Sequence, residues 1–121
     1  VKEAGRVAVV DRGRKIRFHP QFQPAGANAN FLRTIDRGHL KVRTYERGVE
    51  DETLACGTGA VASALIAAFK GLVTSPVSIK TSGGEILTVH FEIEGRKVKK
   101  VFFEGDVHII YEAEMWEEAY E

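Results

Sequence analysis

A single cysteine, Cys56, lies in the most chemically distinctive stretch of this sequence. It is followed by Gly57-Thr58-Gly59 and then by an alanine-rich apolar run over residues 60–69. That composition predicts a buried helix, which places the thiol at a helix N-terminus. Unpaired backbone N–H groups and the helix dipole favour a thiolate there, and the same N–H groups can hold a carboxylate. We interpret the segment as a base beside an anion cradle.

The alternative interpretation of Cys56 is a buried, inert thiol, which is the usual role of an isolated cysteine. The two glycines that flank Thr58 argue against it, because each weakens a helix start by roughly 0.5 to 1 kcal/mol relative to alanine. A helix with only a structural role has little reason to carry both.

Charged residues before the cysteine suggest recognition of an amino acid. Arg47 can bind a carboxylate in bidentate fashion, and Glu46 can accept hydrogen bonds from an ammonium group. The alternative is that residues 46–52 form an ordinary solvated loop. Thr53 offers a cap for the helix that follows.

Two runs upstream predict a β-hairpin that would position these groups. Residues 27–35 and 39–45 are each typical of a strand, and the intervening Asp-Arg-Gly supplies a turn. In such a hairpin Asn28 and Glu46 lie at the same end, where both can face one pocket. Asn28 can equally be a turn or cap residue.

After the helix the sequence predicts a meander of four strands, and before the hairpin it is ambiguous. The four candidates are Val77–Thr81, Glu85–Ile93, Val98–Phe103 and Val107–Glu112. One face of the last two is expected to join the core, through Val101, Phe103, Val107, Ile109 and Tyr111.

Near the start of the chain, residues 7–10 favour a strand and residues 11–18 favour a helix. The acidic and aromatic tail 115–121 is suited to docking on a neighbour or to fraying.

Composition limits the classes of function. The 121 residues fit one globular domain, with 44% hydrophobic and 28% charged residues. The formal net charge is zero, so nothing draws the chain as a whole to nucleic acid or to an anionic membrane. No apolar run approaches the ~20 residues that span a bilayer, and we expect no signal peptide. The single cysteine fits a reducing cytoplasm. We expect no metal site or catalytic triad from His90, Asp106 and His108, because two of them lie within alternating strands and can be ordinary outward residues.

Two motifs resemble the diaminopimelate epimerase family. Residues 45–48, Glu52-Thr53 and then residues 56–60 resemble the segment around that family's second cysteine, and residues 28–31 resemble its substrate-binding asparagine segment. The resemblance runs from about Gly13 to Tyr111 and covers only the C-terminal half of such an enzyme.

The resemblance implies a fold and an activity. The fold would be α+β, with a curled, mostly antiparallel sheet wrapped around a central helix, and residues 1–121 would form one domain of a pseudo-symmetric pair whose N-terminal domain this chain does not contain. The activity would be epimerisation of LL-diaminopimelate to the meso form, an isomerase step in the biosynthesis of lysine and peptidoglycan precursors. It would need two cysteine bases and no pyridoxal phosphate.

The resemblance also implies roles for individual residues. Cys56 would be one base, with the second cysteine in the N-terminal domain, and Glu46 would contact the reacting amino group. The backbone N–H groups of Gly57 and Thr58 would bind the reacting carboxylate, while Asn28 and Arg47 would orient the far end of the substrate. Tyr111 would lie at a homodimer contact, with a half-buried strand aromatic as the alternative.

Two departures from the family pattern affect these expectations. The spacing from Glu46 to Cys56 is one residue longer than in many relatives, and the first half is missing, so we expect this chain alone to be inactive. The competing hypotheses are a racemase or isomerase of the same fold that acts on another amino acid, and a non-catalytic module that associates with itself.

Overall fold

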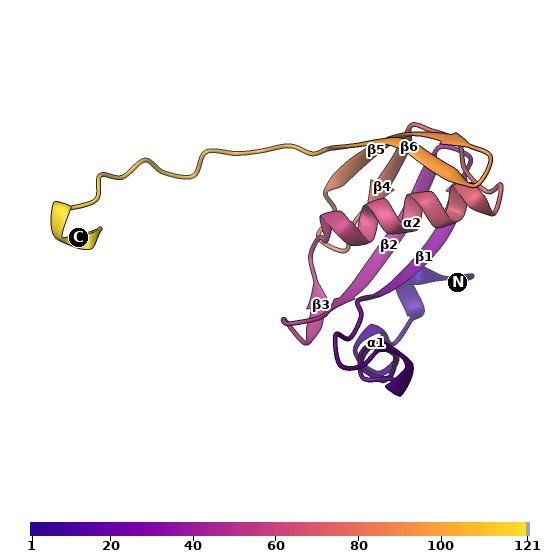
Figure 1. Ribbon diagram of the computed structural model, residues 1–121, viewed down its shortest axis with the longest axis horizontal. Coiled ribbons are helices and arrows are strands. Elements are labelled where there is room, and N and C mark those ends of the chain that lie inside the picture. The colour runs from indigo at the N-terminus through magenta and orange to yellow at the C-terminus, as the bar shows by residue number, and fades with distance from the viewer. Residues whose placement is uncertain (121) are drawn as a thin grey trace.

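The computed structural model describes residues 1–120 and shows the expected α+β architecture (Figure 1). Its two α-helices and six strands, in chain order, are α1 (Val9–Arg17), β1 (Ala29–Asp36), β2 (His39–Glu46), β3 (Asp51–Thr53), α2 (Gly57–Phe69), β4 (Val77–Lys80), β5 (Ile86–Glu94) and β6 (Lys97–Glu104). Short 3-10 turns cover Ala4–Arg6, Pro20–Phe22 and Glu117–Ala119. Glu121, the last residue of the predicted tail, lies outside the described residues.

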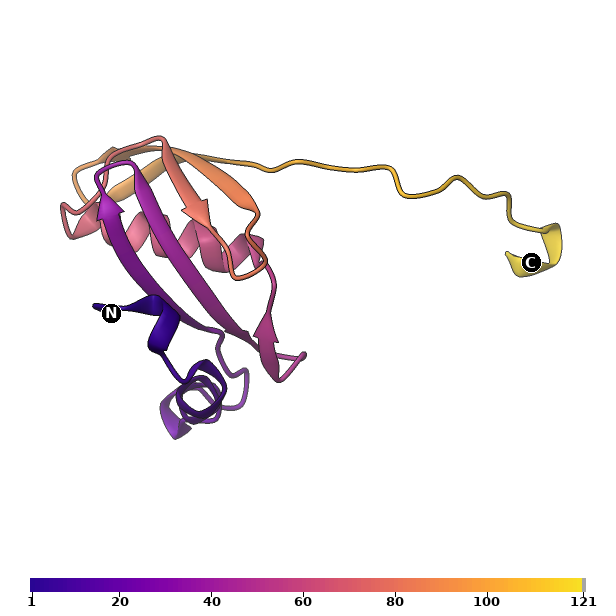
Figure 2. The same cartoon turned by 180° about the vertical axis from the view of Figure 1, so that it is seen from behind.

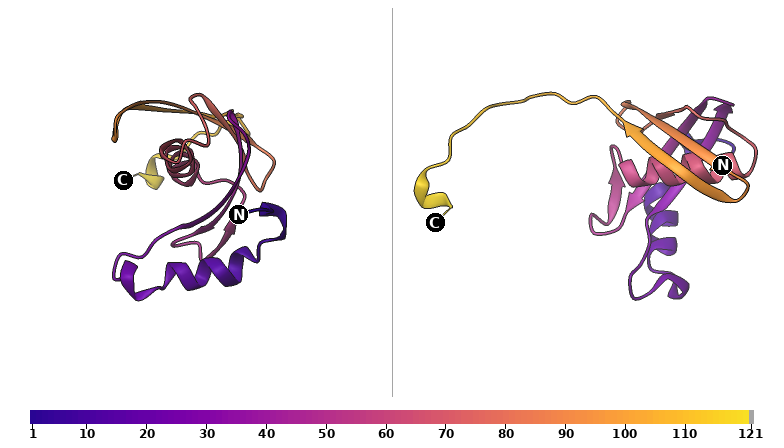
Figure 3. Two further views of the ribbon diagram at one scale, coloured as in Figure 1. Left: turned by 90° about the vertical axis from the view of Figure 1, so that its right-hand side faces the viewer. Right: turned by 45° about the horizontal axis from the view of Figure 1, so that its top comes forward.

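The strands form one open, curled sheet in the order β1-β2-β4-β5-β6, with β3 paired to β2. All pairs are antiparallel except β2 with β4, because α2 carries the chain back between those two strands. Seen along the sheet, the strands curve around α2 (Figure 3). The prediction of a mostly antiparallel sheet wrapped around a helix is therefore confirmed.

The hairpin of β1 and β2 separates two hydrophobic cores. Alternate residues of a strand point to opposite faces. On one face Leu40 and Val42 pack with α2 and with Val77 and Ile79 of β4. On the other face three residues pack with Val9 of α1, namely Ala29, Phe31 and Tyr45. The hairpin thus lies between the two helices, as the view from behind also shows (Figure 2).

The N-terminal segment differs from the β-strand that residues 7–10 favoured. Helix α1 already begins at Val9, whose side chain is 2% exposed. Gly13 lies on the buried side of this helix and packs directly on Tyr45, because an added Cβ would overlap the Tyr45 side chain. Close packing on the hairpin therefore outweighs the strand propensity of the valines.

Helix α2 confirms the predicted central helix. Its small residues Ala60, Ala64 and Ala67 are at most 2% exposed, which lets the sheet approach closely. The helix ends at Phe69, and Gly71 follows with a φ of 70°, in the left-handed region that suits glycine after a helix.

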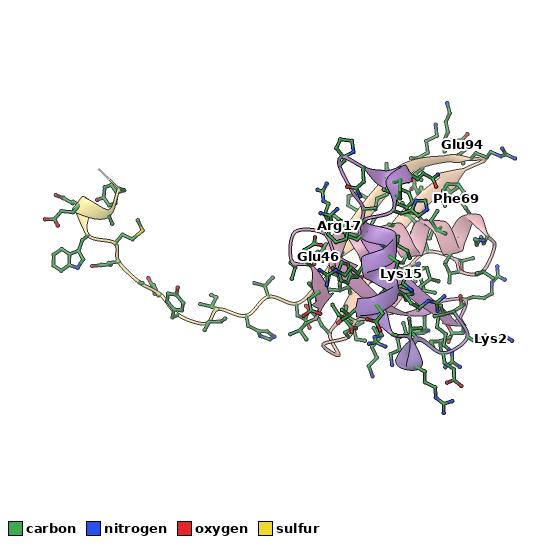
Figure 4. All side chains as sticks on the ribbon, turned by 90° about the horizontal axis from the view of Figure 1, so that it is seen from below. Lys2, Lys15, Arg17, Glu46, Phe69 and Glu94 are labelled. Atoms are coloured by element: carbon green, nitrogen blue, oxygen red, sulfur yellow. The ribbon has the colours of Figure 1, made fainter. Side chains whose placement is uncertain are left out.

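The C-terminal part corrects the predicted meander. Strands β4, β5 and β6 form it, but residues 107–112 form no strand and extend away from the sheet (Figures 1 and 4). The residues expected to bury one face are exposed, at 38% and 50% for Val101 and Phe103 and at 80% or more for Val107, Ile109 and Tyr111. Phe103 lies beside Gly57 of α2, so the helix covers that face only in part. Over residues 1–120 no helix has the length and hydrophobicity of a membrane span.

Candidate active site

Cys56 is the N-cap of α2 and lies at the helix start, as predicted. Its backbone is extended, and its Sγ accepts a hydrogen bond from the backbone N–H of Gly59 over 3.4 Å. The Thr58 hydroxyl lies 3.5 Å from the same sulfur. Thr53 was the expected cap, but its Oγ1 is buried and has no hydrogen-bond partner within residues 1–120. The thiol itself therefore takes the place of the capping oxygen.

The first turn of α2 leaves two backbone donors free. Gly59 N–H bonds to the sulfur and Ala60 N–H bonds to the backbone oxygen of Cys56. Gly57 and Thr58 donate to no group in the described part of the chain. Free N–H groups at a helix start attract a carboxylate, so the two residues predicted to bind one are placed to do so.

Glu46 lies on the face of the hairpin that carries α2, and Asn28 lies at the same end of the hairpin. Asn30 pairs with Thr44 across the β1–β2 ladder, and side chains two residues apart share a face. Thr44 lies against the first turn of α2, next to Gly59. Glu46, two residues after Thr44, therefore follows on the same face, and Asn28 precedes β1 at the same end of the hairpin. Glu46 makes no side-chain hydrogen bond or ion pair within residues 1–120, so its carboxylate is open to a ligand.

The turn after β2 is held in place by Arg17 of α1. Glu50, with a φ of 61°, accepts hydrogen bonds from Arg17 Nε and from the Gly48 N–H, each over 2.8 Å. The Gly48 bond, followed by Arg17, lowers the pKa of the Glu50 carboxyl. This residue lies in the part of the loop that is one residue longer than expected. The extra length is thus held against Arg17 and does not disturb the pairing of Glu46 with Asp51.

A second set of polar contacts, which the sequence did not predict, holds the segment before the cysteine in place. Arg43 makes a bidentate ion pair with Glu52, with both N–O distances 2.7 Å. Ser82 donates to Glu52 over 2.6 Å, and Arg43 also donates to the backbone oxygen of Ala4 over 2.8 Å. Strand β3 overlaps the run for which a solvated loop was the alternative, and these bonds connect it to the N-terminal segment and to the β4–β5 turn.

An apolar groove opens beside the candidate site. It runs along α2 and is lined by Gly57, Thr58, Val61, Ala62, Leu65 and Phe103. Within residues 1–120 no three His, Cys, Asp or Glu side chains gather as a metal site would require. Tyr111 belongs to the extended segment after β6 and is 80% exposed.

The fold and the site define a class: an α+β half that presents a thiol at a helix start beside amide and carboxylate side chains. The sequence model of the diaminopimelate epimerase family matches residues 2–110. The chain is 48% identical to the diaminopimelate epimerase of Aquifex aeolicus (strain VF5), over 100% of this chain and 43% of that protein. It is 46% identical to the diaminopimelate epimerase of Hydrogenobaculum sp. (strain Y04AAS1), over 83% of this chain and 35% of that protein. It is 41% identical to the diaminopimelate epimerase of Chlorobaculum tepidum, over 92% of this chain and 42% of that protein.

This chain belongs to the diaminopimelate epimerase family. It spans less than half the length of these curated relatives.

Proposed function

We propose that this chain supplies one of the two proton-transferring bases of a cofactor-independent epimerase that interconverts LL- and meso-diaminopimelate. The observation that carries the proposal is the bond from the Gly59 N–H to the Cys56 sulfur beside the free N–H groups of Gly57 and Thr58. A hydrogen bond to the charged form and the positive end of α2 both favour the thiolate. Membership of the family makes the amino-acid substrate the natural ligand.

In this proposal the chain binds the reacting carbon from one side. The substrate carboxylate accepts from the N–H groups of Gly57 and Thr58, and Glu46 accepts from the ammonium group. Negative charge that develops next to the carboxylate in the transition state is stabilised by those donors. The Cys56 thiolate removes the α-proton, or the thiol returns one, on its own face of the carbon. Asn28 and Arg47 orient the far end of the substrate.

The opposite face of the carbon requires a second base, because inversion needs proton removal from one side and delivery on the other. The described residues contain no other cysteine. We therefore propose that an N-terminal domain, which the resemblance implies, supplies a second cysteine and closes the groove beside α2. Exclusion of water strengthens the electrostatic contacts in such a site.

Exchange of the α-proton into deuterated water tests this function. LL-diaminopimelate is incubated with the 121-residue chain, and with a chain extended by an N-terminal domain of the family. We expect the extended protein to catalyse exchange, the Cys56→Ala variant of it to lose at least 100-fold in rate, on the order of a lost general base, and the short chain to be inactive. Exchange by the extended protein that survives Cys56→Ala would contradict the role of Cys56.

A second candidate function is a self-associating module without catalysis. The exposed apolar side chains of the tail, Val107, Ile109, Ile110 and Tyr111, favour it, because soluble monomers rarely expose such a set. Sedimentation of the 121-residue chain, together with alkylation of Cys56, separates the two. A tight dimer whose thiol does not react supports the module, whereas a reactive thiol supports the enzyme. A panel of other amino acids in the exchange assay tests a racemase of different specificity.

A further inference from the structure

Asn30 and Thr44 form a polar pair directly beneath the first turn of α2. They face each other across the β1–β2 ladder, and the Thr44 hydroxyl donates to Asn30 Oδ1 over 2.8 Å. Thr44 is only 4% exposed. A buried hydroxyl without a partner is costly, so this bond fixes the orientation of both side chains. Neither residue was among the site residues that the sequence suggested.

The pair sets the position of Gly59. A Cβ added to Gly59 would overlap Asn30 Oδ1 and would lie 3.2 Å from both Thr44 Oγ1 and Cys56 Sγ. The two polar side chains and the sulfur therefore surround one point of the helix backbone. Gly59 is the residue whose small size permits this approach, and its N–H is the donor to the sulfur.

We propose that Asn30 and Thr44 are positioning residues for Cys56, because their bonded pair supports the turn at Gly59 and keeps the Gly59 N–H directed at the sulfur. The inference rests on the proposed function of Cys56 as a base. A displaced Gly59 lengthens the bond to the sulfur, which is already 3.4 Å, and so reduces the stabilisation of the thiolate. Glu46 is the charged group of β2 on the same face of the hairpin, and it is unchanged by substitutions in the pair.

Alkylation of Cys56 by iodoacetamide over a pH series tests the pair in the 121-residue chain. Thr44→Val keeps the shape of the side chain and removes the hydroxyl, and Asn30→Ala removes the acceptor. We expect both variants to react about three- to tenfold more slowly near neutral pH, with the rate profile moved to higher pH, because the thiolate is the reacting species. Thr44→Ser keeps the donor and should restore the wild-type profile.

Thr34→Val is the matched control, since it removes a hydroxyl from the same hairpin at a position that faces Leu40 and not Asn30. It should leave the alkylation profile unchanged. Denaturant unfolding of each variant is measured in parallel. A Thr44→Val protein that loses stability but keeps the wild-type alkylation profile would show a purely structural role and would overturn the inference.

Asn30→Asp provides a second variant that preserves shape and the acceptor for Thr44. Its negative charge beside the sulfur should slow alkylation near neutral pH at least as much as Asn30→Ala does, because a like charge disfavours the thiolate. An unchanged rate would refute the placement of the pair next to the sulfur. Failure of the proposed function looks different: wild-type Cys56 would then react no faster than the thiol of the urea-unfolded chain.

Discussion

The side-chain oxygen of Asn28 accepts a hydrogen bond from the backbone N–H of Arg47 over 2.8 Å. This bond joins the residue before β1 to the residue after β2, so it closes the end of the hairpin that carries the candidate site. The Arg47 guanidinium also donates to the backbone oxygen of Ala25 over 2.7 Å. The Asn28 amide group and the other guanidinium donors stay available to a ligand, so both residues can serve structure and binding at once.

Replacing Asn28 by alanine should destabilise the chain. The Arg47 N–H loses its acceptor, and we expect the free energy of unfolding to fall by about 1 kcal/mol in urea titrations. Asn28→Asp is the matched control, because it keeps the accepting oxygen and removes only the amide donors. It should unfold near the wild-type midpoint while weakening substrate binding in the extended enzyme. Equal stability losses in the two variants would contradict the hydrogen bond as the cause.

Much of this arrangement was predictable, because local patterns dictated it. The alternation in residues 39–45 predicted which face of β2 is buried, and the alanine-rich run predicted α2. Both patterns are informative because each element buries one face against the other. The location of Asn28 and Glu46 at the same end followed from the two strand patterns and the turn between them.

Contacts between residues distant in sequence could not be predicted. The approach of Gly59 to Asn30 and Thr44 depends on how α2 lies on the hairpin, and the ion pair of Arg43 with Glu52 depends on β3. The prediction of a strand in the tail was wrong for a different reason. Its alternating pattern is typical of a strand, but a strand also needs a partner for its backbone groups, and residues 107–112 pair with no strand of the sheet, not even with its edge strand β6.

Two replacements of Cys56 should separate capping from chemistry. Serine is a good N-cap and alanine is a poor one, so Cys56→Ser should retain the wild-type stability while Cys56→Ala loses roughly 0.5 to 1 kcal/mol. Both should abolish alkylation of the chain and proton exchange in the extended enzyme. Denaturant unfolding and the exchange assay check the two effects independently. If Cys56→Ala were as stable as the wild type, the sulfur would contribute nothing as a cap.

Gly13→Ala tests the docking of α1. Alanine should favour the helix by about 1 kcal/mol, but its Cβ would overlap the buried side chain of Tyr45. Such overpacking costs about 1 to 3 kcal/mol, so we expect a net loss of stability. Gly5→Ala is the control, because a Cβ at that position meets no atom within 4 Å. Thermal unfolding followed by circular dichroism measures both, and a Gly13→Ala protein more stable than wild type would contradict the packing.

Removal of the tail should leave the fold intact. The residues from Val107 to Met115 are exposed and form no regular structure, so a chain that ends at Asp106 should unfold at the wild-type denaturant midpoint. The same truncation removes Tyr111, the predicted dimer contact, and any association that depends on the tail should disappear in sedimentation runs. A lower unfolding midpoint for the truncated monomer would show that the tail packs on the sheet.

The ion pair of Arg43 and Glu52 should make stability depend on pH. The hydrogen bonds from Arg43, the largest cause, and from Ser82 lower the pKa of the Glu52 carboxyl below its ordinary value of 4.5, although burial opposes them. The folded state therefore favours the carboxylate. Its contribution is fully present above 4.5 and is lost as the pH falls through the lower pKa of the folded state.

Glu52→Gln isolates this contribution. At neutral pH we expect the variant to be less stable by about 1 to 3 kcal/mol, because a neutral amide replaces a charged acceptor of the bidentate pair. The difference from wild type should shrink as the pH falls below 4.5, where Glu52 of the unfolded chain becomes protonated, and towards the lower pKa of the folded Glu52 carboxyl. Urea titrations at several pH values measure it, with Glu112→Gln on the exposed tail as the control that should match wild type throughout. A difference that stayed constant into acid would mean that the carboxylate charge does not hold β3 in place.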